Sequence, residues 1–226
     1  MMKRYLAEFI GTFFIVFAPI SVGATGTDPG LLVAAIASGL PVLAMIYVLG
    51  SISAAHFNPA VTFAFALTKR FPWKHVAPYW VAQLLGSACA AGLSLALFAS
   101  HHGTHVPNDP SNLVRNLGTE ITVSVLLMFV IMSVATDKRV NGAIPAIAIG
   151  FTVILGVLIG GPVTGGSMNP ARSFGPALFA GGAALANFWL YIVGPIIGTA
   201  IAAFTYETIR MEPEFAKGAP DDLVKS

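Results

Sequence analysis

The sequence predicts an all-α membrane protein with six transmembrane helices plus two half-membrane helices, arranged as two inverted repeats. Only 10% of the 226 residues are Asp, Glu, Lys or Arg, against about 25% in a soluble domain, and 56% are hydrophobic. Apolar runs long enough to cross a bilayer recur along the chain, and its two halves repeat one pattern. This composition excludes an ordinary soluble enzyme, and the net charge of +2 gives no reason to expect a nucleic-acid partner.

Six apolar runs are long enough to cross the roughly 30 Å hydrocarbon core of a bilayer. Two shorter pieces would each cover about half of that thickness as helices. The first run follows two basic residues, as in a signal peptide. It is longer than an h-region, Glu8 interrupts it and further runs follow, so we expect it to be retained as a helix. The long runs lie near 5–24, 31–51, 76–99, 117–136, 143–161 and 187–208, and the short pieces near 58–68 and 169–180.

The basic residues predict the orientation in the membrane. Ten of the twelve lie in segments that six spans place on one side, which is the cytoplasmic side by the positive-inside rule. We therefore expect a multi-pass protein of the plasma or inner cell membrane with both termini in the cytoplasm. Arg115 is expected as a solvated charge in the outer loop 100–116, whereas Arg172 lies inside the second short piece and must line a polar cavity or be paired. The ten are Lys3, Arg4, Lys69, Arg70, Lys74, Lys138, Arg139, Arg210, Lys217 and Lys225.

The two halves of the chain match at a spacing of 111 or 112 residues. The clearest match is Asn58-Pro59-Ala60 with Asn169-Pro170-Ala171. We treat residues 1–226 as a single membrane domain with repeats at about 1–105 and 112–210 and a polar tail at 211–226. Because each repeat holds an odd number of spans, the second crosses the membrane upside down, which is typical of transport proteins.

Glu8 and Glu120 lie in the spans that open the two repeats, and a carboxylate there is costly unless it accepts hydrogen bonds. Their symmetric placement favours a structural brace for irregular backbone beside a pore. A coupling-ion or proton site is the alternative. Small residues spaced by four in the third and sixth spans are expected to let helices pack closely. They are Ala82, Gly86 and Ala90, and Gly194, Gly198 and Ala202.

Each Asn-Pro-Ala piece predicts a half-membrane helix with Asn58 or Asn169 as its N-cap and proline at its first position. Two such helices entering from opposite faces bring two positive dipole ends and two amide donors to the midplane. This arrangement orients a neutral solute through its oxygen and repels cations and protons. The preceding segments are expected to be extended and to offer carbonyl acceptors. The expected carbonyls are those of Ala54, Ala55, His56, Gly165, Gly166 and Ser167.

At these motifs the chain resembles the major intrinsic protein family, the aquaporins and aquaglyceroporins. The resemblance extends from AEFIGTFF through SAAHFNPAVT, TEITVSVLLMF and GGSMNPARSFGPAL to the last GP-x-x-G span. It implies the aquaporin fold and a passive channel with no catalytic residues and no cofactor or metal, one pore per subunit, in a homotetramer. The stretches FPWKHV, LMFVIMSVATD and GPVTGGSM are closer to the nodulin-like intrinsic proteins and their bacterial relatives. That branch is associated with glycerol and neutral metalloid acids.

The resemblance assigns the selectivity filter to Ser38, Val157, Gly166 and Arg172. This set departs from the water-selective and the glycerol-facilitator patterns, because it holds neither an aromatic residue nor a histidine. Ser38 and Gly166 remove bulk, Ser38 adds a donor and an acceptor, and Arg172 offers donors and repels cations. The set fits compact uncharged solutes such as glycerol, urea and boric, silicic or arsenous acid, with water passing too. Ser173 departs from the glycerol-facilitator pattern.

Other interpretations stay open beside a channel. A coupled secondary transporter of a small neutral solute also uses inverted repeats and broken helices, whereas no residues are spaced for a membrane enzyme. We expect His56 to be a hydrogen-bonded structural residue, with a pH gate as the alternative. We expect the outer-loop histidines His101, His102 and His105 to be solvated, with a metal site as the alternative. Cys89 is expected to be buried in a span.

Overall fold

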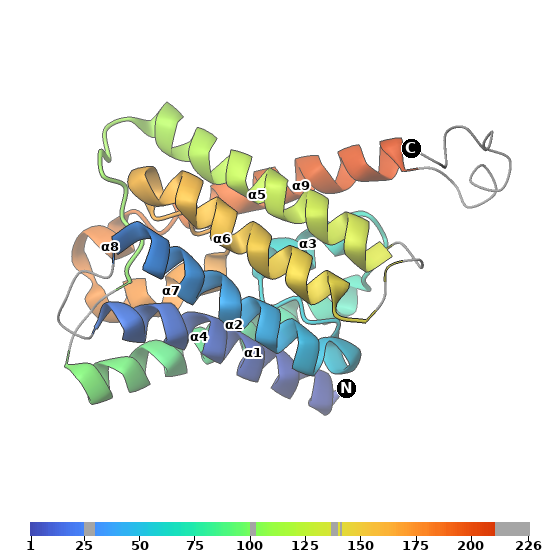
Figure 1. Cartoon of the computed structure of the whole chain (residues 1–226), viewed down its shortest axis with the longest axis horizontal. Coiled ribbons are helices and arrows are strands. Elements are labelled where there is room, and N and C mark those ends of the chain that lie inside the picture. The colour runs from blue at the N-terminus through green and yellow to red at the C-terminus, as the bar shows by residue number, and fades with distance from the viewer. Residues whose placement is uncertain (25–29, 100–102, 137–139, 141, 211–226) are drawn as a thin grey trace, which may run out of the picture.

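The computed structural model describes residues 1–24, 30–99, 103–136, 140 and 142–210. Six long helices pack side by side, and the shorter helices lie among them and at one end (Figure 1). Each of the six is long and apolar enough to cross a membrane. The long helices are α1 (Met2–Gly23), α2 (Gly30–Ser53), α4 (Val76–Phe98), α5 (Leu113–Thr136), α6 (Ile144–Thr164) and α9 (Leu190–Ile209). The short helices are α3 (Pro59–Leu67), η1 (Trp73–His75), α7 (Pro170–Ala180) and α8 (Gly182–Ala186).

The predicted fold class is confirmed, since each predicted span and each short piece has its helix. Differences are confined to the ends of helices. The fifth span continues to Thr164, where Gly165 stops it in the left-handed conformation with a φ of 91°. Helix α5 begins at Leu113, so Arg115 is exposed on its first turn and does not lie in the preceding loop. Helix α8 was not predicted, because its five residues merge with the apolar run of α9.

Glycines allow the closest helix contacts at matching places in the two repeats. A Cβ on Gly86 of α4 would lie 2.4 Å from the carbonyl oxygen of Phe9 in α1. A Cβ on Gly198 of α9 would lie 2.4 Å from the carbonyl oxygen of Ile121 in α5. Any larger residue would force these helices apart, so the small-residue pattern fixes the spacing within each repeat.

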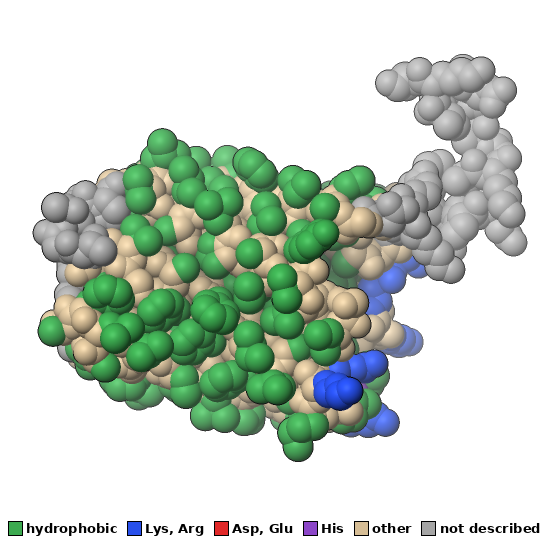
Figure 2. Space-filling model, turned by 60° about the horizontal axis from the view of Figure 1, so that its bottom comes forward, with side chains coloured by type: hydrophobic (Ala, Val, Ile, Leu, Met, Phe, Trp, Pro, Cys, Tyr) green, Lys and Arg blue, Asp and Glu red, His purple; other side chains and the backbone are tan. Residues whose placement is uncertain are grey.

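Basic side chains gather at the end of the molecule where the N-terminus and the end of α9 lie, and hydrophobic side chains dominate the rest of the visible surface (Figures 1 and 2). Cys89 is exposed on the outer face of α4, so the expectation that it is buried was wrong. The inward stripe of α4 is formed by Gly86 and Ala90, which places Cys89 outside. Lys138, Arg139, Lys217 and Lys225 lie outside the described residues, as does the predicted tail 211–226.

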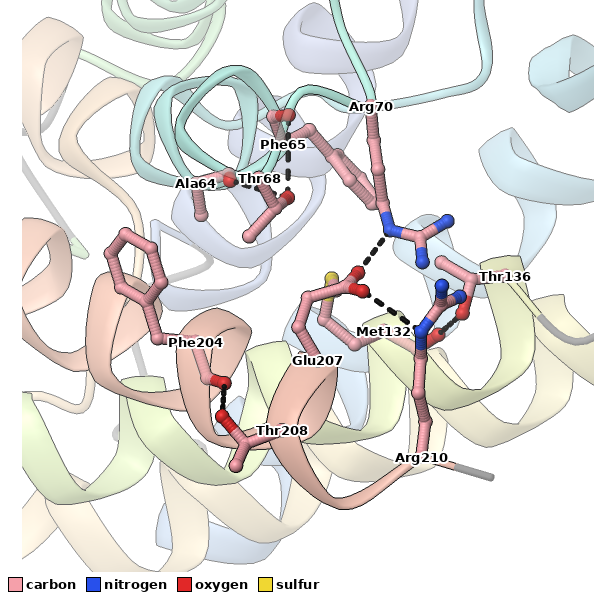
Figure 3. Close-up of polar contacts among 10 residues, drawn as sticks. All are labelled: Ala64, Phe65, Thr68, Arg70, Met132, Thr136, Phe204, Glu207, Thr208 and Arg210. Carbon is pink, nitrogen blue, oxygen red and sulfur yellow. Dashed lines mark hydrogen bonds and ion pairs between the residues drawn. The ribbon is translucent and has the colours of Figure 1, made fainter. Parts of the chain in front are cut away.

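Ion pairs at this basic end join the two repeats (Figure 3). Arg70, which follows α3 of the first repeat, donates from Nε to Glu207 of α9 in the second repeat. The other carboxylate oxygen of Glu207 lies 2.8 Å from Nε of Arg210. The three side chains are 24–33% exposed, so we expect this cluster to contribute little to stability.

Candidate functional site

The two half-helices begin with the same capping geometry. The side-chain oxygen of Asn58 accepts a hydrogen bond from Ala60 N at 2.9 Å, and that of Asn169 accepts one from Ala171 N, also at 2.9 Å. In both helices proline occupies the first position, where its missing N–H costs nothing. The asparagines therefore cap α3 and α7 as their sequence position predicts.

The same asparagines hold the two half-helices against each other. Nδ2 of Asn58 donates to the carbonyl of Met168 at 2.9 Å, and Nδ2 of Asn169 donates to the carbonyl of Phe57 at 2.9 Å. The positive ends of α3 and α7 consequently meet in the interior of the molecule. Because an amide nitrogen carries two hydrogens, each asparagine keeps one donor beyond this reciprocal pair.

Glu8 is fully buried and accepts four hydrogen bonds around the start of the first half-helix. Two come from backbone N–H groups, those of His56 at 3.0 Å and Phe57 at 2.7 Å. Two come from side chains, Ser53 Oγ at 2.7 Å and Gln83 Nε2 at 2.8 Å. These donors lie at membrane depth, where lipid offers no substitute acceptor.

Glu120 occupies the matching position in the second repeat. It is fully buried and accepts from Ser167 N and Met168 N at 3.0 Å each, and from Thr164 Oγ1 at 2.6 Å. The donors are those of the first repeat displaced by 111 residues, apart from the contribution of Gln83. The repeat predicted from the sequence is therefore present at the level of individual hydrogen bonds.

The carboxylates determine where the neighbouring carbonyl groups point. In a trans peptide the N–H of one residue and the C=O of the preceding residue point in opposite directions. Because the N–H groups of Ser167 and Met168 face Glu120, the carbonyls of Gly166 and Ser167 face away from it. Both accept hydrogen bonds from Nη1 of Arg172, at 2.8 Å and 3.2 Å.

The first repeat displays its carbonyl groups in the same manner. With two N–H groups bound to Glu8, the carbonyls of Ala55 and His56 point away from the carboxylate. Ala54, Ala55 and His56 line a cavity of about 510 Å³. Within the described ranges no donor of the protein bonds to these three carbonyls, so they are available to a molecule in the cavity.

The sequence predicts an extended conformation for the segments before the two asparagines, and this prediction was wrong. Successive N–H groups of an extended strand point to opposite sides, so two of them cannot reach one carboxylate. The chain instead uses left-handed residues at three matching positions of each repeat. Their φ angles are 68° at Ala54, 49° at Ala55 and 48° at Phe57, and 91° at Gly165, 63° at Gly166 and 57° at Met168.

Arg172 and Ser38 are joined by a hydrogen bond between the two repeats. Nη2 of Arg172 donates to Oγ of Ser38 at 2.7 Å, and that hydroxyl donates to the carbonyl of Ala34 at 2.7 Å. The expectation that Ser38 offers a donor to solute was therefore wrong, because its only hydrogen is already bound. Three hydrogen bonds to the protein use part of the five-donor guanidinium and fix its orientation.

Gly166 and Val157 lie in contact on the same wall. A Cβ on Gly166 would lie 3.1 Å from the Cα of Val157 and 3.0 Å from the carbonyl oxygen of Gly156. The φ of Gly166 is 63°, which also favours glycine. Glycine is therefore favoured here by backbone conformation and by close packing, as well as by the space that it leaves in the filter. The four predicted filter residues are all buried, and α2, α6, α7 and the segment before α7 supply them.

Two cavities meet at Arg172. The larger, of about 510 Å³, is lined by Asn58, Asn169 and His56 among others, and extends to residues near the ends of α2 and α5. The smaller, of about 150 Å³, is lined by Ser38 and Val157, and Arg172 lines both. The buried cation therefore lies where a molecule passing from one cavity to the other would meet it.

Two histidines, His56 and His105, line the cavities, and each is anchored through its Nδ1. His56 lies 3.1 Å from Thr62 Oγ1 and its ring stacks on Phe65, with centroids 5.0 Å apart. His105 lies 3.0 Å from Ser173 Oγ and packs against the ring of Tyr191.

The prediction of a solvated loop was wrong for His105, which is 6% exposed, while His101 and His102 lie outside the described residues. Burial, reinforced by the charge of Arg172, lowers the pKa of His105 well below its usual range, so the ring is neutral at neutral pH. The one sequence signal that bears on the burial of His105 is its partner Ser173, the residue at which the chain departs from the glycerol-facilitator pattern. Among the residues that the structure describes, no three His, Cys, Asp or Glu side chains are grouped to hold a metal ion.

Six membrane-spanning helices in inverted repeats, with two half-helices meeting beside a buried arginine and two cavities, define a transmembrane channel. Comparison with known proteins agrees. The family model described as Major intrinsic protein matches residues 1–206. The chain belongs to this family of water and small-solute channels, which are not enzymes.

Relatives of known name cover most of the chain. Aquaporin NIP1-1 of Zea mays is 44% identical over 92% of this chain and 75% of its own length. Nodulin-26 of Glycine max is 43% identical over 92% of this chain and 78% of its own length. In structure the chain resembles the aquaglyceroporin from Plasmodium falciparum, with a TM-score of 0.83, 23% identity and coverage of 92% and 96%. The resemblance to the nodulin-like branch is thereby confirmed.

Proposed function

We propose that this channel passes water and small uncharged hydroxylated solutes, and excludes ions and protons. The observation that carries the proposal is the placement of Arg172 at the junction of the two cavities, held there by Ser38 and two carbonyls. The other filter side chains are small or aliphatic. A path of this kind is wider than a filter with aromatic residues and keeps a fixed positive charge.

The polar groups along the path suit solutes that both donate and accept hydrogen bonds. Free carbonyls of Ala54, Ala55 and His56 accept, and the remaining amide hydrogens of Asn58 and Asn169 donate. Glycerol, urea and the neutral boric, silicic and arsenous acids fit this pattern. The name aquaglyceroporin, carried by the similar Plasmodium protein, supports solutes larger than water.

The same groups favour passive conduction over coupled transport. The carboxylates of Glu8 and Glu120 are each held by three or four protein donors, as expected for braces of the irregular backbone. A coupling-ion site needs carboxylate oxygens that can exchange partners during transport. With the two dipole ends and Arg172, the centre of the path is positive and repels cations.

We further propose a homotetramer with both termini on the cytoplasmic side of a plasma or inner cell membrane. The basic end of the described chain supports this orientation by the positive-inside rule. The outward faces of the spans carry large apolar side chains, which can face either lipid or a neighbouring subunit. Crosslinking of the protein in native membranes tests the tetramer.

Replacing Ser38 by tryptophan tests the filter. We expect Ser38→Trp to slow glycerol and boric acid by roughly tenfold relative to water. The indole ring crowds the path, and this crowding should raise the barrier for the larger solutes by about 1–3 kcal/mol. Stopped-flow light scattering on proteoliposomes measures all three fluxes. Thr208→Trp, which adds the same ring on the exposed face of α9, is the matched control. Equal loss of water and solute flux in Ser38→Trp would remove Ser38 from the constriction.

A further inference from the structure

Two basic segments of the first repeat lie in contact at the basic end of the molecule. The hydroxyl of Tyr5, in the first turn of α1, lies 3.2 Å from Nδ1 of His75 in η1. The Tyr5 ring also packs edge-on against Tyr79 of α4, with centroids 5.9 Å apart. Arg4 and Lys74 are the chain neighbours of Tyr5 and His75, and both are exposed. The contact between the two segments therefore brings two exposed cations to neighbouring positions on the surface.

These two cations have no carboxylate to pair with among the residues that the structure describes. The two buried glutamates are bound to the segments before the half-helices. Glu207 is already paired with Arg70 and Arg210 (Figure 3). Asp109 lies before α5, at the opposite end of the molecule, where it accepts from Ser111 N at 3.0 Å. The positive charge of Arg4 and Lys74 is therefore available to an anion at the membrane surface.

Exposed apolar side chains adjoin the two cations. Trp73, beside Lys74 in η1, is 55% exposed. Leu6 of α1, and Val81 and Leu85 on the outer face of α4, are also more than half exposed. Tryptophan is favoured at the boundary between lipid headgroups and hydrocarbon. This surface therefore offers cationic, aromatic and aliphatic groups to the headgroup, the boundary region and the acyl chains of a phospholipid.

The second repeat shows that the fold does not require these residues. It has neither a cation nor a tryptophan at the three matching positions, 112 residues further along the chain. The counterparts are Asn116 for Arg4, Leu185 for Trp73 and Ala186 for Lys74. Only Lys3 keeps a basic counterpart, Arg115. Because Leu185 and Ala186 are exposed in α8, packing does not select the residue type at those positions.

We propose that Arg4, Trp73 and Lys74 form a binding site for an anionic phospholipid of the leaflet at the basic end. The two cations bind the oxygens of the headgroup phosphate, and the acyl chains lie over the apolar faces of α1 and α4. The positive-inside rule explains the sign of the charge at this end, but it does not require cations, an exposed tryptophan and an apolar face to adjoin. The site is separate from the path through the channel, so the inference goes beyond the proposed function.

Quenching of tryptophan fluorescence by brominated lipids tests the site. The full chain with Trp189→Phe, which removes the exposed tryptophan of the opposite end, is reconstituted in vesicles of phosphatidylglycerol and phosphatidylcholine. One lipid at a time carries bromine on its acyl chains, and Trp80, bound to Pro59 O, is present in every sample. The dependence of quenching on the fraction of brominated lipid gives the enrichment of the anionic lipid beside the ring. At roughly fivefold for each cation near the surface, we expect an enrichment of about tenfold or more.

Matched charge variants separate a site from a diffuse attraction. Arg4→Gln and Lys74→Gln should each lower the enrichment by about fivefold. Arg210→Gln removes the same charge at the same end, beside Glu207, and should leave the enrichment unchanged. An equal fall in Arg4→Gln and Arg210→Gln would overturn the proposal, because it would show a diffuse attraction. Equal quenching by the two brominated lipids in the Trp189→Phe protein would also overturn it.

A soluble headgroup distinguishes a lipid from a free phosphate. Glycerol phosphate in excess should leave the enrichment unchanged, because it lacks the acyl chains that the apolar faces bind. Displacement of the lipid by glycerol phosphate would overturn the assignment to a phospholipid. Water flux shows that each variant folds as a channel, and if one of Arg4→Gln and Lys74→Gln passes no water, the other decides. Failure of the proposed function is separate, because the quenching does not depend on which solutes pass.

Discussion

An Arg172→Ala channel should leak protons and small cations while still passing water. Arg172 is the buried cation at the junction of the two cavities, and two unit charges 4 Å apart repel by about 4 kcal/mol at an effective dielectric of 20. Because the dipole ends of α3 and α7 remain, the barrier to cations should fall by less than this repulsion. We expect cation permeability to rise by about tenfold or more. Proteoliposomes with a pH-sensitive dye inside, under an imposed potential, measure the leak.

Two further arginine variants separate the charge of Arg172 from its shape. Arg172→Lys keeps the charge and loses the planar fork, so it should retain ion exclusion while its solute preference changes. Arg115→Ala removes an exposed arginine from the first turn of α5 and should behave like the unmodified protein. Unchanged ion exclusion in Arg172→Ala would show that the helix dipoles suffice alone.

Glu120→Ala should strongly destabilise the fold. The substitution leaves the buried N–H groups of Ser167 and Met168 and the hydroxyl of Thr164 without their acceptor. At about 1–3 kcal/mol for each of these three donors, the free energy of unfolding should fall by about 3–9 kcal/mol, a large part of the 5–15 kcal/mol of an ordinary domain. Thermal unfolding in detergent, followed by circular dichroism, measures the loss.

Matched carboxylate variants decide between a brace and a coupling site. Glu120→Gln keeps one acceptor oxygen and should lose less stability than Glu120→Ala. Glu207→Gln alters a partly exposed ion pair at the basic end and should change stability by less than about 1 kcal/mol. If Glu120→Gln abolished solute flux at unchanged stability, the carboxylate would act in transport and the structural role would be wrong.

Features that depend on local composition and spacing could be predicted from the sequence. Hydropathy was sufficient to find the six spans, and proline after Asn58 and Asn169 was sufficient to place the starts of the half-helices. The spacing of 111 or 112 residues predicted the two repeats, and the structure extends this match to the donors around Glu8 and Glu120. Each of these signals lies within one short segment or in its repeat.

Features that depend on contacts between distant segments were missed. Ser38 bonds to Arg172, 134 residues away, and nothing near Ser38 shows that its hydroxyl is already occupied. His105 bonds to Ser173, 68 residues away, and a histidine-containing stretch between polar residues looks solvated. The left-handed residues before the asparagines follow from two N–H groups sharing one carboxylate, a requirement set by Glu8 and Glu120 in other helices.

Solute flux into proteoliposomes with and without an ion gradient tests passive conduction most directly. Stopped-flow light scattering compares water, glycerol, urea and boric acid across a range of concentrations. A passive channel predicts that each flux rises linearly with the solute gradient, without saturation at low concentration, and does not change when sodium and proton gradients are abolished. Solute flux that saturates at low concentration and requires an ion gradient would contradict a passive channel and indicate a coupled transporter.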